Sequence, residues 1–109
     1  MKIVTLAALL ISLAPSAALA GPGNAEAGKA TYDKRCTICH GKTGAGDGPA
    51  GKAFKGVIPD LSSKEVQSLR DADIAKVITE GKGKMTAVKD ISKDDIANVT
   101  AFIRTLAKK

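Results

Sequence analysis

Aromatic residues are scarce in this chain of 109 residues, and tryptophan is absent. The only aromatic side chains are those of Tyr32, Phe54 and Phe102. A chain this short builds a marginal core from its own side chains alone. We therefore expect the fold to take additional apolar mass from a bound group.

Cysteine and histidine are also scarce, with two Cys and one His in the whole sequence. All three lie in one run, Cys36-Thr37-Ile38-Cys39-His40. Two thiols at positions i and i+3 lie on one side of a helical turn, from which they can form thioethers with the two vinyl groups of one haem. The imidazole that follows is placed to reach the iron, so this run is typical of a c-type haem attachment site.

Three other uses of this attachment run stay open. A disulfide between Cys36 and Cys39 would close a very short loop and would stabilise the fold only weakly. A thioredoxin-like redox pair needs a βαβ context, whereas the flanking residues have helical spacing. Structural zinc needs a fourth nitrogen or sulfur ligand beside Cys36, Cys39 and His40, and the sequence has no further Cys or His.

The N-terminus has the layout of a secretory signal peptide. Lys2 supplies a positive start, residues 3–14 are largely apolar, and Ala18-Leu19-Ala20 is a small-x-small cleavage site. The apolar stretch is shorter than the roughly 20 residues of a membrane-spanning helix. We predict a signal peptide over residues 1–20 and one domain over residues 21–109, exported to the periplasm.

Helical spacing and breaker residues predict an all-α domain. Residues 24–40 have helical spacing and lead into a glycine-rich loop over residues 41–51. Ser62 begins a capping-box pattern, Asp71 is a second expected helix cap, and Ser92 is the expected N-cap of a last helix. Because no alternating strand pattern of useful length is present, we expect about four helices.

The glycine-rich loop matches two nucleotide-binding patterns only in its letters. Gly46 to Gly51 fits G-x-G-x-x-G, but no apolar strand leads into it, and Ala53 stands where a phosphate loop has Ser or Thr. We expect instead that the loop lets the backbone pass close to a flat cofactor.

Met85 is the expected second axial ligand. Met1 would leave with the signal peptide, so Met85 is the one methionine of the predicted mature domain. Methionine is more often core filler, but Met85 lies in a Gly/Lys segment without apolar periodicity. A six-coordinate haem needs a second donor, and no histidine remains for this role. Lys82 and Lys84 are the alternative donors.

The predicted mature domain resembles a class I cytochrome c over essentially its whole length. Gly28 and Tyr32 resemble that family's N-terminal helix, in which a glycine lets the C-terminal helix approach and an aromatic packs at the crossing. Phe102 falls at the family's C-terminal aromatic position. Pro49 matches the proline whose carbonyl accepts a hydrogen bond from the ligand histidine, and Met85 falls near the family's sulfur ligand.

The resemblance implies a small cytochrome c fold around one covalently attached haem c, with His40 and Met85 as axial ligands and one-electron transfer as the function. The sequence departs from the family at Thr86, where proline is common, and in lacking a Trp near a haem propionate. The propionate partners are therefore open, with the candidates Lys52, Lys55 and Arg70.

The formal net charge of +6 is expected to steer acidic redox partner proteins, with Lys82 and Lys84 beside the ligand. The sequence contains no nucleic-acid-binding motif, catalytic triad or carboxylate pair. We therefore expect a monomeric carrier, not an enzyme, with neither nucleic acid nor a small-molecule substrate as partner. Two alternatives stay open: a haem sensor or peroxidase-like enzyme, which Thr86 would favour, and an electron-entry domain of a larger complex.

Overall fold

The computed structural model describes residues 23–54 and 56–108, so the predicted signal peptide and Lys55 lie outside the described residues. The elements, in chain order, are α1 (Ala25–Arg35), α2 (Thr37–His40), the 3-10 helix η1 (Gly51–Phe54), α3 (Lys64–Gln67), α4 (Asp71–Glu80) and α5 (Lys93–Thr105). Within these residues there is no strand, only an isolated bridge between Lys82 and Met85. The all-α prediction is confirmed, with five α-helices in place of about four.

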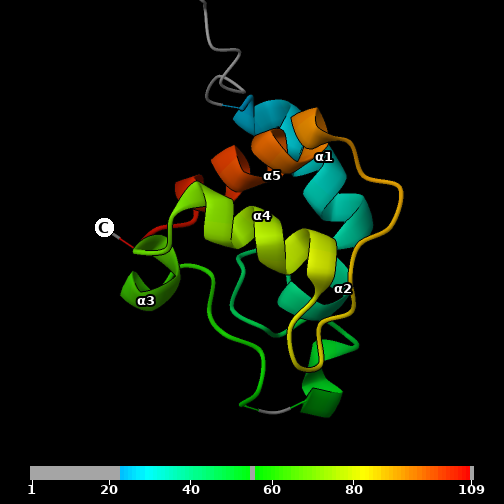
Figure 1. The fold of residues 1–109 in the computed structure, drawn as a ribbon. Coiled ribbons are helices and arrows are strands. Elements are labelled where there is room, and N and C mark those ends of the chain that lie inside the picture. The colour runs from blue at the N-terminus through cyan, green and yellow to red at the C-terminus, as the bar shows by residue number, and fades with distance from the viewer. Residues whose placement is uncertain (1–22, 55, 109) are drawn as a thin grey trace, which may run out of the picture.

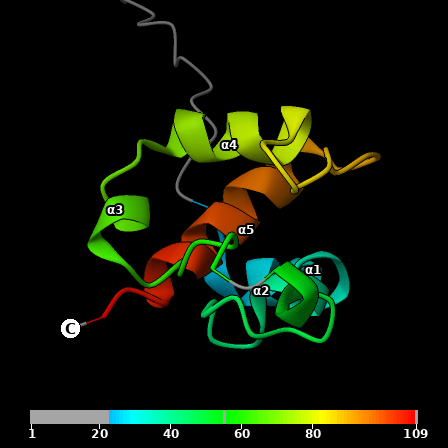
Figure 2. The ribbon, with the colours of Figure 1, turned by 90° about the horizontal axis from the view of Figure 1, so that it is seen from below.

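Helix α5 lies at the centre of the fold. It packs on α1 at one side and on α4 at the other (Figures 1 and 2). Helix α2 contacts both α1 and η1. Helix α2 and η1 form the lower part of the view in Figure 1, and α1 lies above them. The loop that follows α4 descends to the level of α2 and η1 in Figure 1. In Figure 2 the same loop lies on the α4 side of the fold.

The predicted helix over residues 24–40 is present as two helices. Asn24 caps α1, because its side-chain oxygen accepts a first-turn N–H at 3.0 Å. Cys36, with φ −121° and ψ −33°, turns the chain from α1 into α2. Its N–H still bonds to the Tyr32 carbonyl at 2.8 Å, and the His40 N–H bonds to the Cys36 carbonyl at 2.9 Å. The attachment run therefore keeps helical spacing across the break.

Two predicted helix caps are wrong by one residue. The N-cap of α3 is Ser63, not Ser62, and its hydroxyl accepts a first-turn N–H at 3.3 Å. The Ser62 hydroxyl instead donates to the Asp60 carboxylate at 2.5 Å. Asp71 lies in the first turn of α4, whose N-cap is Arg70. At the first of these caps, Ser62 and Ser63 are the same residue type, and the local bond between Ser62 and Asp60 leaves Ser63 as the cap.

The predicted N-cap of the last helix is confirmed. Ser92 caps α5, since its hydroxyl accepts the Asp95 N–H at 3.0 Å. Helix α4 stops before Gly81, whose φ of +79° favours glycine.

Helices α1 and α5 cross with their backbones in contact. A Cβ placed on Gly28 would lie 1.8 Å from the carbonyl oxygen of Asn98. At the same crossing the fully buried Tyr32 packs against Phe102, with ring centroids 4.8 Å apart and planes inclined by 51°. The resemblance predicted this arrangement of Gly28, Tyr32 and Phe102, and it is confirmed.

The hydrophobic core is a single cluster drawn from α1, α3, α4, α5 and the segment before α3. Its buried members are Tyr32, Leu61, Val66, Ile74, Ile78, Ile96, Val99, Phe102 and Ile103. Cys36 and Met85 are partly buried and pack against this cluster. The attachment run and the candidate sulfur ligand therefore border the same core.

Candidate functional site

The attachment run lies at the break between α1 and α2. Thr37 begins α2, and its hydroxyl donates to a carbonyl in the last turn of α1 at 2.8 Å, which fastens the two helices together. Cys36, Cys39 and His40 are half-buried, whereas the side chain of Ile38 is 60% exposed. The two thiols and the imidazole thus lie on the more buried side of the run.

Both thiols of the run are free, so no disulfide joins them. Burial raises the pKa of the Cys36 thiol to about 11, and the Arg35 charge offsets part of this effect. A thiol with such a pKa stays protonated near neutral pH and is a poor exchange nucleophile. The described residues also hold no group of three or more His, Cys, Asp or Glu placed to bind a metal ion.

His40 has a buried ring nitrogen without a partner. Its Nδ1 forms no hydrogen bond within the described part of the chain, and burial lowers the pKa of the imidazole. Buried polar atoms are nearly always hydrogen-bonded. The unpartnered Nδ1 therefore indicates that His40 has a role other than packing. The predicted hydrogen bond from His40 to the Pro49 carbonyl is not formed here, and the role of Pro49 stays a prediction.

The glycine-rich loop closes over α2. The N–H groups of Gly46, Gly48 and Ala50 donate to the carbonyls of His40, Cys39 and Ile38 at 2.8, 3.2 and 2.8 Å. A Cβ on Gly48 would lie 2.3 Å from the Thr37 carbonyl oxygen, and one on Gly51 2.2 Å from that of Cys39. The glycines therefore allow a close approach to α2 and satisfy the carbonyls of this short helix. Their approach to a cofactor stays a prediction.

Met85 lies at the end of a tight turn. The backbone groups of Lys82 and Met85 bond in both directions, at 2.9 and 3.0 Å, and Gly83 within the turn has a φ of +58°. The Val88 N–H then bonds to the Ile78 carbonyl at 2.8 Å, which ties the chain back to α4. The side chain of Met85 consequently rests on the core instead of pointing freely into solvent.

Two hydrogen bonds near the site carry no sequence signal. The Tyr32 hydroxyl donates to the Gly41 carbonyl at 2.5 Å, and burial raises the pKa of this phenol well above its usual value. The Arg35 guanidinium donates to the Lys89 carbonyl. Sequence reasoning missed both bonds because each acceptor is a backbone carbonyl, which any residue supplies.

Of the candidate propionate partners, Lys55 lies outside the described residues, and no contact among the described residues joins Lys52 to Arg70. Arg70 is engaged by the Asp73 carboxylate, which accepts two guanidinium bonds at 3.1 Å. Lys52 is exposed on η1. The propionate partners therefore remain open.

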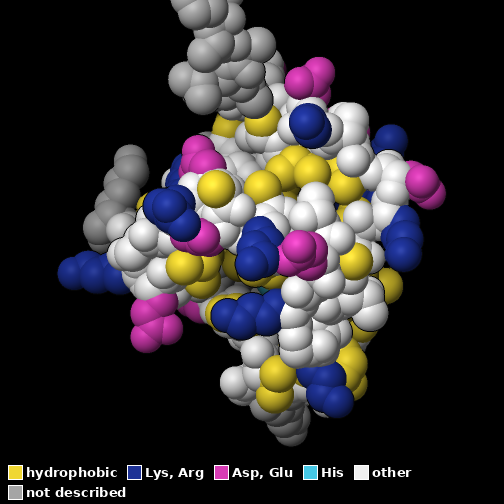
Figure 3. All heavy atoms as spheres, viewed as in Figure 1, with side chains coloured by type: hydrophobic (Ala, Val, Ile, Leu, Met, Phe, Trp, Pro, Cys, Tyr) yellow, Lys and Arg dark blue, Asp and Glu magenta, His cyan; other side chains and the backbone are white. Residues whose placement is uncertain are grey.

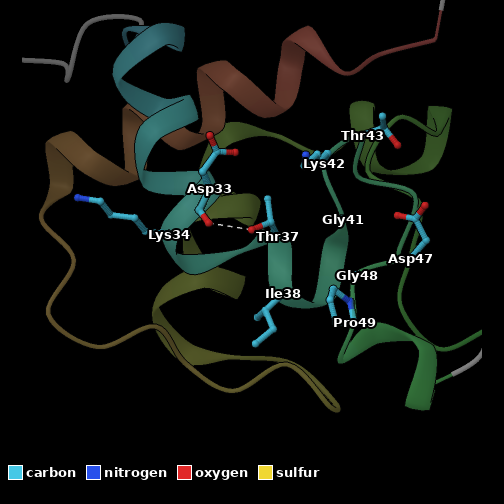
Figure 4. A pocket seen from close by; sticks show the side chains of 10 residues that line it. All are labelled: Asp33, Lys34, Thr37, Ile38, Gly41, Lys42, Thr43, Asp47, Gly48 and Pro49. Atoms are coloured by element: carbon cyan, nitrogen blue, oxygen red, sulfur yellow. Dashed lines mark hydrogen bonds between the residues drawn. The ribbon is translucent and has the colours of Figure 1, made fainter.

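A hollow of about 500 Å³ opens on the outer side of the α1–α2 junction (Figure 4). Its wall includes Asp33, Lys42, Asp47 and the exposed Ile38. Of the predicted site residues, Pro49 lines it, whereas the two cysteines, the histidine and the methionine do not. The hollow therefore shares only Pro49 with the predicted site residues.

The residues of the candidate site fit a covalently attached haem. Cys36 and Cys39 supply two free thiols at helical spacing, and His40 supplies an imidazole with an orphaned nitrogen. Met85 supplies a soft thioether against the same small core. No helix among the described residues is long and apolar enough to cross a membrane.

Comparison with known proteins gives matches along most of the chain. Residues 23–103 match the family described as cytochrome C oxidase, cbb3-type, subunit III. Cytochrome c-554(547) of Halothiobacillus neapolitanus is 32% identical over 90 residues, which cover 77% of this chain and 98% of that protein.

Two solved structures share the fold. The KustC0563 c-type cytochrome matches with a TM-score of 0.64 and 23% identity, over 74% of this chain and 98% of that chain. The Kuenenia stuttgartiensis reducing HAO-like protein complex Kustc0457/Kustc0458 contains a match with a TM-score of 0.65 and 20% identity, over 79% of this chain and 44% of that chain.

The family match spans all six helical elements apart from the last residues of α5. The chain is therefore a c-type cytochrome of the family described as cytochrome C oxidase, cbb3-type, subunit III, and family membership implies covalently bound haem c.

Proposed function

We propose that this cytochrome is an exported one-electron carrier with one haem c, held by thioethers to Cys36 and Cys39 and ligated axially by His40 and Met85. The observation that carries the proposal is that Cys36 and Met85, which are far apart in the sequence, both pack against the same hydrophobic core. The orphaned Nδ1 of His40 supports the same assignment.

The proposed pair of iron ligands suits an electron carrier better than an enzyme. Bound haem c supplies a ferric–ferrous couple. Each thiol would add across one vinyl group, so that one carbon–sulfur bond forms per cysteine and the proton of the thiol passes to the neighbouring vinyl carbon. The thioether of Met85 is a soft donor that raises the reduction potential relative to harder donors. His40 would supply the other ligand, and an iron held by both residues would have no open position for dioxygen or peroxide.

We further propose that residues 1–20 direct export to the periplasm and that residues 21–109 form the functional domain. The positive start, the apolar stretch and the small-x-small site of the sequence support this division.

Acidic redox proteins are the proposed partners of a monomeric carrier. Residues 81–89 carry Lys82, Lys84 and Lys89 and no acidic residue. All three are exposed, and none forms an ion pair within the described residues. Basic side chains also appear without acidic ones at the lower end of the face in Figure 3. Unpaired positive charge beside the proposed ligand would speed encounters with an acidic partner.

The family description favours a second candidate function, delivery of electrons as a subunit of a terminal oxidase. The size of the native protein separates the two candidates. A carrier elutes on its own at the mass of one chain, whereas a subunit co-purifies with oxidase components.

Substitution of Met85 tests the carrier assignment. Met85→Ala is expected to abolish the sulfur-to-iron charge-transfer band of the ferric protein, to lower the potential, and to let carbon monoxide bind the ferrous protein. Wild type is expected to resist carbon monoxide at neutral pH. Ready binding by wild type would sink the carrier assignment and favour a sensor or peroxidase. An unchanged spectrum in Met85→Ala would favour Lys82 or Lys84 as ligand.

The intact mass tests attachment and export together. The purified periplasmic protein should begin at Gly21 and weigh as much as residues 21–109 plus one haem, and acid–acetone should leave the colour with the protein. Cys36→Ala, with one thioether left, should shift the reduced absorption bands. Extractable haem or two alkylatable thiols in the coloured protein would refute covalent attachment at this site.

A further inference from the structure

Arg35 joins two segments that are far apart in the sequence. It is the last residue of α1, directly before Cys36, and its guanidinium donates a hydrogen bond to the main-chain carbonyl of Lys89. Lys89 belongs to residues 81–92, which lead from α4 past Met85 to α5. We refer to residues 81–92 as the strap.

The strap is held mainly from the α4 side. Its turn bonds only to itself, through Lys82 and Met85, and the Val88 N–H bonds to the Ile78 carbonyl of α4 at 2.8 Å. Among the described residues, the Arg35 bond is the one hydrogen bond or ion pair between the strap and α1 or α2. The helix that leads into the attachment run therefore reaches the strap through a single polar contact.

We infer that Arg35 is a positioning residue for Met85, because it holds the strap against the helix that leads into the attachment run. The inference rests on the proposed ligation by Met85. The two anchors, at Val88 and Lys89, follow Met85 by three and four residues, and the end of α4 precedes it. Both ends of the turn that carries the thioether are therefore fixed, and the thioether has less freedom to leave the iron.

The chemistry of the contact suits this role. A guanidinium presents several N–H donors in a fixed plane and stays charged at all relevant pH values, so one donor can hold the carbonyl while the others remain hydrated. The acceptor is a backbone atom, so the contact depends on Arg35 and not on the side chain of Lys89. Because the bond is exposed, its loss should loosen the strap without unfolding the protein.

The experiment compares Arg35→Ala with Lys34→Ala in the haem-loaded protein. Lys34 is the neighbouring exposed cation of α1 and has no hydrogen bond or ion pair among the described residues, so both variants lose one charge at the same helix end. The readouts are hydrogen exchange of the strap amides, carbon monoxide affinity of the ferrous protein, and the temperature at which the ferric charge-transfer band is lost.

Arg35→Ala is expected to speed exchange of the amides near Lys89 roughly tenfold, the order that one hydrogen bond to a charged group supports. Carbon monoxide should bind more tightly by a similar factor, since it competes with Met85 for the iron. The charge-transfer band should be lost at a lower temperature. Arg35→Lys should restore part of each change, and Lys34→Ala and Lys89→Ala should match wild type.

Equal effects of Arg35→Ala and Lys34→Ala would overturn the inference, because charge alone would then explain them. Exchange and carbon monoxide affinity unchanged in Arg35→Ala would overturn it as well. If wild type lacks the charge-transfer band and binds carbon monoxide as readily as Met85→Ala, the ligation by Met85 fails instead. The two failures are therefore told apart by wild type itself.

Discussion

The hydroxyl of Tyr32 donates a hydrogen bond of 2.5 Å to the carbonyl oxygen of Gly41, the residue that follows His40. Tyr32 is fully buried, and Gly41 is buried at the start of the glycine-rich loop. The bond ties the helix that crosses α5 to the backbone beside the proposed iron ligand. Since burial raises the pKa of Tyr32, the phenol remains a donor throughout the neutral range.

Tyr32→Phe should therefore reduce stability while the ring contact with Phe102 is kept. The Gly41 carbonyl would lose its donor in a buried position, which costs about 1–3 kcal/mol. Denaturant unfolding of the haem-loaded protein measures this cost. A change below about 0.5 kcal/mol, the usual scatter of neutral substitutions, would mean that solvent replaces the phenol.

Gly28→Ala tests the backbone contact between α1 and α5. Helix propensity alone would make this substitution stabilising by about 1 kcal/mol. The added Cβ would meet the Asn98 carbonyl at 1.8 Å, so the helices must separate, and we expect a loss of about 3 kcal/mol or more. Ala30→Gly, at an exposed site of the same helix, is the propensity control and should cost about 1 kcal/mol. Stabilisation by Gly28→Ala would contradict the close crossing.

Asp60 should make the fold sensitive to acid. The hydroxyl and N–H of Ser62, followed by the Lys108 ammonium, bond to its carboxylate and lower its pKa from 3.8 to about 2. The pKa is lower in the folded state, so this stabilisation is complete above 3.8 and is lost as the pH falls toward about 2.

The free energy of unfolding measured against pH should therefore fall in that window, and Asp60→Asn should lack this part of the fall. Glu65→Gln changes an exposed carboxylate that forms no ion pair in the described residues and is the control. Parallel curves for wild type and Asp60→Asn would show that the Asp60 contacts do not persist in solution.

Charge reversal of Lys82 and Lys84 should slow electron transfer to an anionic acceptor. With ferricyanide at low ionic strength we expect the bimolecular rate to fall about tenfold, since steering effects begin at this size, and the difference should vanish in high salt. Reversal of Lys64 and Lys93, which are exposed on other elements, makes the same change in net charge. Equal slowing by both pairs would leave net charge, and not the strap lysines, as the cause.

Local patterns predicted the features that depend on neighbours in the sequence. The spacing of Cys36, Cys39 and His40 required a helical turn, and the structure has one. Ser92 was identified as a cap because the capping bond reaches only three residues along the chain. Gly28 and Phe102 followed from the resemblance, which carries information about distant contacts that spacing lacks.

Tertiary contacts decided what the patterns could not. Ser62 and Ser63 are the same residue type, but the Ser62 hydroxyl bonds to the Asp60 carboxylate, which also accepts a bond from the distant Lys108, and Ser63 is left as the cap. The turn that seats Met85 on the core, and the loop bonds that cover α2, involve backbone groups with no residue signature. The ligand roles of His40 and Met85 and the role of Pro49 remain predictions for the experiments above.

The crossing of α1 and α5 also bears on how the protein is made. The Asn24 N–H bonds to the Asn98 side chain at 2.8 Å, across 74 residues. Closing so long a loop costs conformational entropy before the contacts between the two helices can form and offset it. The ribosome makes α1 well before α5, so Tyr32 lacks the Phe102 ring until α5 has been made. Chains broken off before α5 lack the packing partner of α1 and should therefore stay unfolded and be degraded, which makes α5 a requirement for folding of the domain.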